Sequence, residues 1–141
     1  MRRSLSLLAV LLPAALLAGC DSSTFVDDRI GCDRVHSFSL GNSASGTLDP
    51  NDCILSDGSA VEFYRFRTGS YRTVFASVTS SRVDPYVEIV DEFGDVVAEE
   101  DNGGAGYSEL TVDLPPGTYY IAVTTFRAGD YGDFFLDTDY Q

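Results

Sequence analysis

The sequence predicts an all-β domain, built as an antiparallel sandwich or barrel. Apolar residues alternate with a period of two in run after run, as in strands that are buried on one face. Turn-forming residues separate these runs at the spacing of about 8–12 residues that is typical of such domains. No window repeats its apolar residues every 3.6 positions over the ten or more residues that a helix requires. The fold class therefore follows from periodicity and turn spacing together.

The individual strands are expected where the alternation is clearest. In chain order, the inward residues are predicted to be Tyr64 and Phe66; Val74, Ala76 and Val78; Val87 and Ile89; Leu110, Val112 and Leu114; and Tyr119, Ile121 and Val123. Turns are predicted between them at 49–52, 57–58, 69–70, 94–95, 102–104 and 115–117.

One hairpin is specified in more detail, by the residues that join 86–90 to 95–98. The connection is Asp91-Glu92-Phe93-Gly94. Aspartate at the start of a turn and glycine near its end suit a type I turn followed by a bulge, with Gly94 in the left-handed conformation.

A family resemblance is carried by several short segments in the same order and spacing. These are 46–49 (GTLD), 62–66 (EFYRF), 84–91 (DPYVEIVD), 100–102 (EDN), 108–110 (SEL) and 116–123 (PGTYYIAV). Together they resemble the bacterial pre-peptidase C-terminal domain over about residues 33–138. The resemblance implies a jelly-roll-like β-sandwich of about eight to nine short strands. It also implies a non-catalytic accessory module for secretion, localisation or substrate binding, and some collagenase relatives bind calcium and collagen.

The N-terminus predicts export and a lipid anchor. Arg2 and Arg3 precede an apolar run from Leu5 to Leu17, which is shorter than the ~20 apolar residues of a membrane span. Leu17-Ala18-Gly19-Cys20 then resembles a bacterial lipobox, which implies cleavage before Cys20 and acylation of that cysteine, with palmitate among its lipids. We therefore expect a signal peptide at 1–19, a lipidated tether at 20–30 and the β-sandwich domain at 31–141.

This arrangement predicts a stand-alone lipoprotein of the bacterial cell envelope, held at the periplasmic face or on the outer surface. The 141 residues include no peptidase sequence beside the module. An acyl chain contributes about 0.8 kcal/mol per buried CH₂, so several chains hold a protein without a transmembrane helix.

The charge excludes one class of partner. The chain has 9 basic and 22 acidic residues, a net charge of −13, and every basic residue is an arginine. A chain of this charge is repelled by nucleic acid, so no nucleic-acid partner is expected. Two explanations of the acidity stay open at this stage: solubility at a crowded surface, and binding of divalent cations.

Cys32 and Cys53 are expected to form a disulfide, because they are an even pair in an oxidising compartment. The pair is not part of the family pattern. A loop of about 20 residues closed in this way stabilises the fold by roughly 3 kcal/mol. Zinc is disfavoured because His36 is the only histidine.

The sequence predicts no enzymatic activity. His36 is the only histidine available for a nucleophilic triad, and no Gly-x-Ser-x-Gly elbow occurs. A carboxylate pair drawn from the glutamates would support an alternative, an envelope hydrolase; the candidates are Glu62, Glu88, Glu99, Glu100 and Glu109. A third interpretation is a purely structural surface lipoprotein.

Calcium is the one cofactor that the sequence suggests. The segment 99–104 concentrates oxygen ligands beside glycines, and the candidate metal ligands are Asp84, Asp101 and Asn102. The alternative is that these aspartates cap turns through nearby backbone amides.

Aromatic residues suggest a binding surface for an envelope protein or polysaccharide. Phe63 and Phe75 have the opposite parity to the core residues of their strands, and Tyr131, Phe134 and Tyr140 cluster near the C-terminus. Exposed rings among polar residues suit peptide or glycan contact, whereas loops that cover the rings would make them part of the core.

Overall fold

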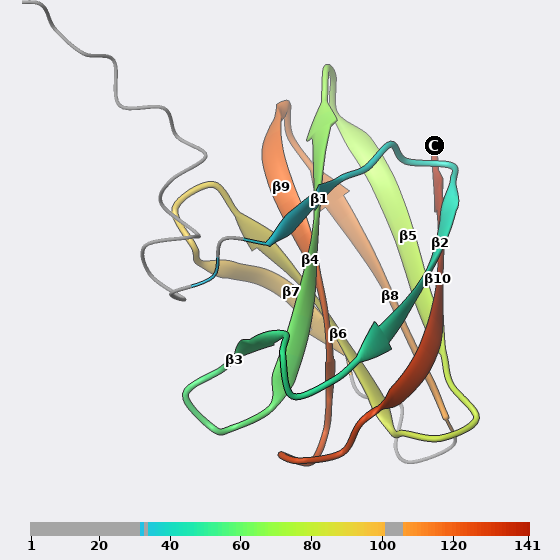
Figure 1. The fold of residues 1–141 in the computed structure, drawn as a ribbon. Coiled ribbons are helices and arrows are strands. Elements are labelled where there is room, and N and C mark those ends of the chain that lie inside the picture. Colours follow the sequence, from blue (N-terminus) through green and yellow to red (C-terminus); the bar gives the residue numbers. More distant parts are fainter. Residues whose placement is uncertain (1–31, 33, 101–105) are drawn as a thin grey trace, which may run out of the picture.

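A computed structural model describes residues 32, 34–100 and 106–141, and these residues form ten strands and no helix. The strands make two sheets that pack face to face (Figure 1). The predicted sandwich is confirmed. It has more strands than the eight to nine expected, because β1 and β3 are only three and two residues long and too short to show a period. None of the described segments is a helix with the length and apolar character needed to cross a bilayer.

The first sheet, called sheet A here, has the order β1-β4-β9-β6-β7, and β3 also pairs with β4. Its strands are β1 (Val35–Ser37), β3 (Cys53–Ile54), β4 (Ala60–Thr68), β6 (Pro85–Asp91), β7 (Val96–Glu100) and β9 (Gly117–Thr125). All pairings are antiparallel except that of β1 with β4, which is parallel and departs from the expected all-antiparallel arrangement.

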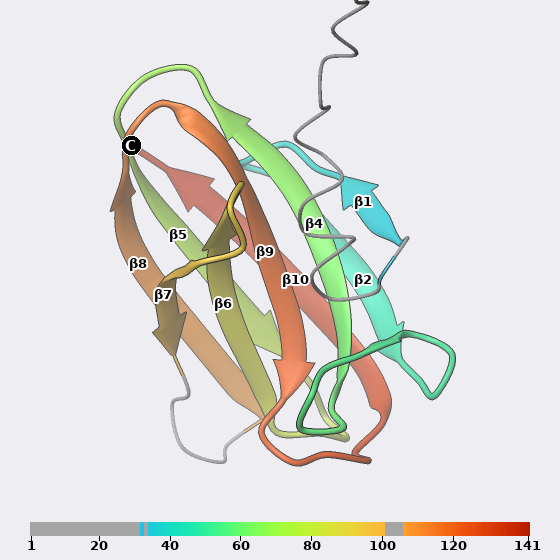
Figure 2. The ribbon, with the colours of Figure 1, turned by 90° about the vertical axis from the view of Figure 1, so that its left-hand side faces the viewer.

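The second sheet, sheet B, has the order β2-β10-β5-β8 and is antiparallel throughout. Its strands are β2 (Ser43–Leu48), β5 (Arg72–Thr79), β8 (Tyr107–Leu114) and β10 (Gly132–Tyr140). Figure 2, turned by 90°, shows β7 of sheet A and β8 of sheet B at the same edge of the sandwich, where the two strands are in contact.

The main core lies between the sheets and contains every inward residue that the alternation predicts. Val112 is only partly buried, and the others are buried. Phe66 stacks on Tyr119 with ring centroids 5.7 Å apart, and Phe134 meets Tyr64 edge to face at 6.3 Å. Of the two alternatives that the sequence leaves open for Phe134, a surface ring and a covered ring, the structure supports the covered one, since Phe134 is 4% exposed in this core.

A second apolar cluster covers part of the outer face of sheet A. It consists of Cys32, Val61, Phe63, Val90, Tyr120 and Ala122. Phe63 does point away from the main core, as its parity requires, yet it is 1% exposed. Val35, Cys53 and Leu55 pack over it, so Phe63 is not a surface ring.

Two glycines are required by local geometry. Gly94 has φ of 83° in the turn between β6 and β7, where its amide donates to the Asp91 carbonyl oxygen, as predicted for this hairpin. Gly46 on β2 faces Phe134, and a Cβ atom there would lie 2.3 Å from Cζ of that ring. The glycine thus allows β2 to approach the core.

Candidate functional site

The two disulfide cysteines are brought together as predicted. Cys32 and Cys53 are bonded, with Cα atoms 5.3 Å apart. The bond links the start of the described chain to β3. Both cysteines also pack in the second apolar cluster, which contains Phe63. Cys20, Asp101 and Asn102, the predicted lipidation site and two predicted calcium ligands, lie outside the described residues.

Asp84, the third predicted calcium ligand, immediately precedes β6. Its Oδ1 atom is buried and has no hydrogen-bond partner among the residues that the structure describes. Glu100, the last residue of β7, pairs with Val87, which lies three residues after Asp84. The described residues contain no cluster of three or more histidine, cysteine or acidic side chains suited to a metal.

His36, Glu62 and Tyr64 form a compact cluster at one edge of the sandwich. The Tyr64 hydroxyl donates to Glu62 Oε2 at 2.7 Å, and His36 Nε2 lies 3.6 Å from the same oxygen. The Thr47 amide donates to Glu62 Oε1, and the His36 ring stacks on Tyr64. Burial, and then the neighbouring Glu62, raise the pKa of the Tyr64 hydroxyl. The Glu62 carboxylate is therefore occupied with structural partners, and it holds β1, β2 and β4 together.

One carboxylate pair is formed across strands, by Glu88 on β6 and Glu99 on β7. Burial, and then the charge of Glu99, raise the pKa of Glu88. Both residues have the opposite parity to Val87 and Ile89, so they lie on the outer face of sheet A rather than in the core. The other strand partner of Glu88 is Ala122 on β9, so the strand pairing brings no nucleophile or histidine next to this carboxylate.

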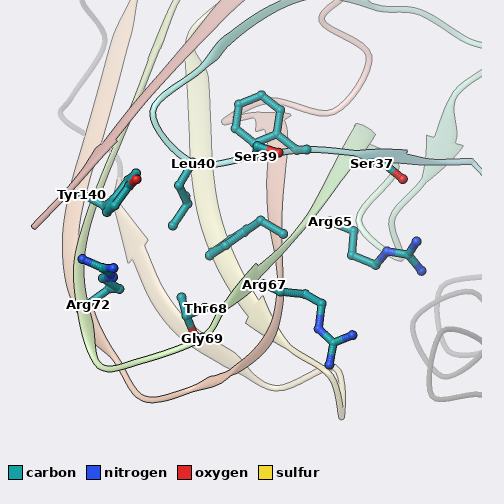
Figure 3. A pocket seen from close by; sticks show the side chains of 11 residues that line it. Ser37, Ser39, Leu40, Arg65, Arg67, Thr68, Gly69, Arg72 and Tyr140 are labelled. Carbon is teal, nitrogen blue, oxygen red and sulfur yellow. The ribbon is translucent and has the colours of Figure 1, made fainter.

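A pocket of about 460 Å³ opens at the end of the sandwich where residues 37–40, β4, β5 and β10 meet. Three of its lining residues are arginines, in an otherwise acidic chain. Figure 3 shows Arg65 and Arg67 pointing away from Arg72 and Tyr140. Arg72 instead lies over the Tyr140 ring, 5.0 Å from its centroid. The guanidinium groups therefore do not converge on a common ligand.

The outer face of sheet B carries charge of a single sign. Side chains on its four strands alternate, so that one set enters the core and the other faces outward. None of the outward side chains is basic, and five are acidic: Glu109, Asp113, Asp133, Asp137 and Asp139. We call this surface the acidic face.

Three of the five carboxylates of the acidic face accept hydrogen bonds from hydroxyl groups. Thr47 Oγ1 donates to Asp133 at 2.7 Å, Thr73 Oγ1 donates to Asp113 at 2.6 Å, and Tyr107 donates to Glu109. Aromatic surface lies among them, because Phe135 is 46% exposed. The face therefore combines fixed negative charge with accessible apolar area.

Sequence reasoning missed the acidic face, although its signal is present. In β10, Asp133, Asp137 and Asp139 alternate with buried Phe134, Leu136 and Thr138, and β8 has the same pattern. The net charge is a property of the whole chain, whereas this signal lies in the alternation of acids along single strands.

Comparison with solved structures decides the fold. The structure resembles the pre-peptidase C-terminal domain of a collagenase from Bacillus anthracis, with a TM-score of 0.59 and 20% identity, over 75% of this chain and 95% of that domain. The chain has the pre-peptidase C-terminal fold. It also resembles Aeromonas hydrophila PliG, a periplasmic inhibitor of g-type lysozyme, with a TM-score of 0.54 and 15% identity over 77% of this chain and 98% of that one. No family model matches the sequence. No curated protein matches it either.

The pre-peptidase C-terminal fold explains the segments that carried the resemblance. Segment 46–49 contains the glycine that admits Phe134, 84–91 is β6 with its turn residue Asp91, and 116–123 is most of β9 at the centre of sheet A. These segments supply packing and turns in this fold. The acidic residues of β8 and β10 lie almost entirely outside them.

Proposed function

We propose that this protein is a non-catalytic, lipid-anchored module of the bacterial cell envelope that binds a protein partner through its acidic face. The observation that carries the proposal is that face, with five carboxylates, an exposed phenylalanine and no outward basic side chain on four strands. Electrostatic complementarity then selects a partner with positive charge and speeds its association.

The named neighbours support this class of function. One is an accessory domain of a collagenase, and the other inhibits a lysozyme, which requires contact with another protein. Two of the predicted carboxylates have non-catalytic surroundings: Glu62 accepts hydrogen bonds from Tyr64 and Thr47, and Glu88 faces Glu99 on the outer side of sheet A.

The proposed anchor is compatible with binding at this face. The described chain begins at Cys32, in the cluster on the outer side of sheet A, whereas the acidic face lies on the opposite side of the sandwich. Cys32, the first described residue, therefore lies on the side of the domain away from the acidic face. Growth of the producing cells with an alkyne-labelled palmitate tests the anchor: the label is expected on the protein and absent from Cys20→Ser, and no label on the unaltered chain would overturn it.

Photo-crosslinking tests partner binding. A photoreactive residue at Thr111, which is exposed between two acids of β8, is expected to capture a protein in the producing cells. The matched control carries the same residue at exposed Ser70, between β4 and β5. The isosteric pair Asp137→Asn and Asp139→Asn is expected to weaken capture at Thr111. Equal capture from Thr111 and Ser70, or no captured protein, would refute the proposal.

We also propose that calcium stabilises the domain near Asp84. The support is the buried Asp84 oxygen that lacks a partner, since a calcium ion takes carboxylate and carbonyl oxygens as ligands. Asp101 and Asn102 would supply further oxygens. A ligand at 100 times its Kd adds about 2.7 kcal/mol to stability. Calcium is thus expected to raise the melting temperature relative to chelator, with no rise for Asp84→Asn; equal melting with calcium and chelator would refute the site.

A further inference from the structure

We infer that a groove at the edge of the acidic face binds a protein segment in which an apolar side chain stands next to arginine or lysine. The groove, called the apolar groove here, lies between the β6–β7 turn and the β8–β9 turn. This inference rests on the proposed function and makes it more specific, because Asp113 belongs both to the acidic face and to the lining of the groove.

The apolar groove offers apolar surface that the fold leaves accessible. Phe93 and Val97 line one side, and Pro115 and Pro116 line the other. Phe93 is 63% exposed and Val97 is 40% exposed. A monomeric domain gains nothing in stability from apolar side chains left in water, and exposed apolar surface rimmed by polar residues marks interaction sites. The groove volume of about 320 Å³ is at the lower end for ligand sites, which suits one or two side chains of a peptide.

The walls of the groove are held in place before any partner arrives. Asp91 Oδ1 accepts hydrogen bonds from the amides of Phe93 and Asp95, both at 2.9 Å, and Gly94 completes the turn. On the opposite wall, the Tyr119 hydroxyl donates to the Pro115 carbonyl oxygen at 3.0 Å. A preformed groove loses little conformational entropy on binding, which favours affinity.

The charge of the rim determines which peptide fits. Asp91, Glu92 and Asp113 line the groove, and none of its lining residues is basic. Burial, and then the charges of Asp91 and Glu92, raise the pKa of Tyr119, which also lines the groove. A segment with arginine or lysine beside its apolar residue meets this charge favourably, whereas an acidic segment is repelled.

Three blocked octapeptides test the inference. One alternates arginine with leucine, one alternates arginine with serine, and one alternates glutamate with leucine. Each is titrated into isotopically labelled protein beginning at residue 21, which retains every described strand and the disulfide, and amide shifts are followed by NMR. The arginine–leucine peptide is expected to bind at least tenfold more tightly than the other two and to shift Phe93, Val97 and Val112.

Matched variants locate the binding. Phe93→Ser is expected to weaken the arginine–leucine peptide about tenfold. Phe126→Ser removes a ring that is similarly exposed, at 58%, but follows the other end of β9, and it is expected to leave binding unchanged. Both residues are largely exposed, so neither variant should unfold the domain.

The outcomes separate this inference from the proposed function. Equal, salt-sensitive binding of both arginine peptides, unaffected by Phe93→Ser, would overturn the groove and leave the acidic face as the binding surface. Binding of the glutamate–leucine peptide as tight as that of the arginine–leucine peptide would overturn the charge requirement. Absence of binding by any peptide would also overturn the groove, while the proposed function would still be decided by crosslinking from Thr111.

Discussion

Replacement of Gly46 by alanine is expected to destabilise the domain through a clash that the structure defines. A Cβ atom at position 46 would lie 2.3 Å from Cζ and 2.6 Å from Cε1 of Phe134, and 2.7 Å from Oε2 of Glu62. Contacts below 3.0 Å do not persist, so one of these groups must move. Gly46 does not have the positive φ seen at Gly94, so the constraint is steric rather than conformational.

The magnitude follows from how little room Phe134 has. The ring is 4% exposed and packs edge to face on Tyr64, which in turn donates to Glu62. Forcing an extra methyl group into a packed core costs about 1–3 kcal/mol. Alanine recovers roughly 0.5–1 kcal/mol of the entropy that glycine loses in a strand. The net loss is therefore up to about 2.5 kcal/mol, and its midpoint of about 1.3 kcal/mol lowers the melting temperature by roughly 5–10 °C in a domain of this size.

The assay is thermal unfolding followed by circular dichroism, with a double-mutant cycle. Gly69→Ala is the matched control, because nothing lies within 4 Å of a Cβ atom there. In the variant that combines Gly46→Ala with Phe134→Leu, the smaller side chain makes room for the new methyl group. The stability loss of this double variant is therefore expected to be about 1 kcal/mol smaller than the sum of the two single losses. Equal melting of Gly46→Ala and Gly69→Ala, or strictly additive losses in the cycle, would refute the steric explanation.

Three further perturbations have expected outcomes. Serine at both Cys32 and Cys53 should reduce the free energy of unfolding in urea by roughly 3 kcal/mol, because the loop between bonded residues 21 apart is no longer closed; no change relative to the oxidised chain would contradict this. Gly94→Val should lower it by about 1–3 kcal/mol, since valine is strained at φ of 83°, while Gly69→Val should not. Glu88→Gln should stabilise the domain at neutral pH and have little effect at pH 4. The pKa of Glu88 is higher in the folded state than its ordinary value of 4.5, which applies to the unfolded chain. Ionisation of Glu88 therefore opposes folding at pH values above about 4.5 and has no such effect at lower pH. A gain of equal size in urea unfolding at both pH values would contradict that assignment.

The sequence predicted the main core because strand periodicity is a local property. Each inward residue from Tyr64 to Val123 is placed by its own strand, without knowledge of the neighbouring strand. The Asp91–Gly94 turn was predictable for the same reason, since four consecutive residues determine its geometry.

The second cluster was not predictable in this way. Whether Phe63 is exposed depends on Cys32, Val35 and Leu55, which come from separate segments and are fixed there by the disulfide and by the parallel pairing of β1. Alternation gives the direction in which a side chain points, and it does not give what covers that side chain. Phe134 differs, because it alternates with outward Asp133 and Phe135 on β10 and enters the main core, so the periodicity of β10 itself indicates its burial.

The acidic face shows how strand order creates a charged surface from residues distant in the sequence. Glu109 and Asp137 lie on strands that flank β5, and both are paired with the same small residue, Ser77. Neighbouring strands are about 4.8 Å apart, so these carboxylates stand roughly 10 Å from each other, which is close to the Debye length at 0.1 M salt. At that separation their mutual repulsion is largely screened and the fold tolerates it, whereas a cationic partner in contact with the face interacts with several carboxylates at once. β5 thus keeps Glu109 and Asp137 two strands apart, which limits the repulsion between these two carboxylates.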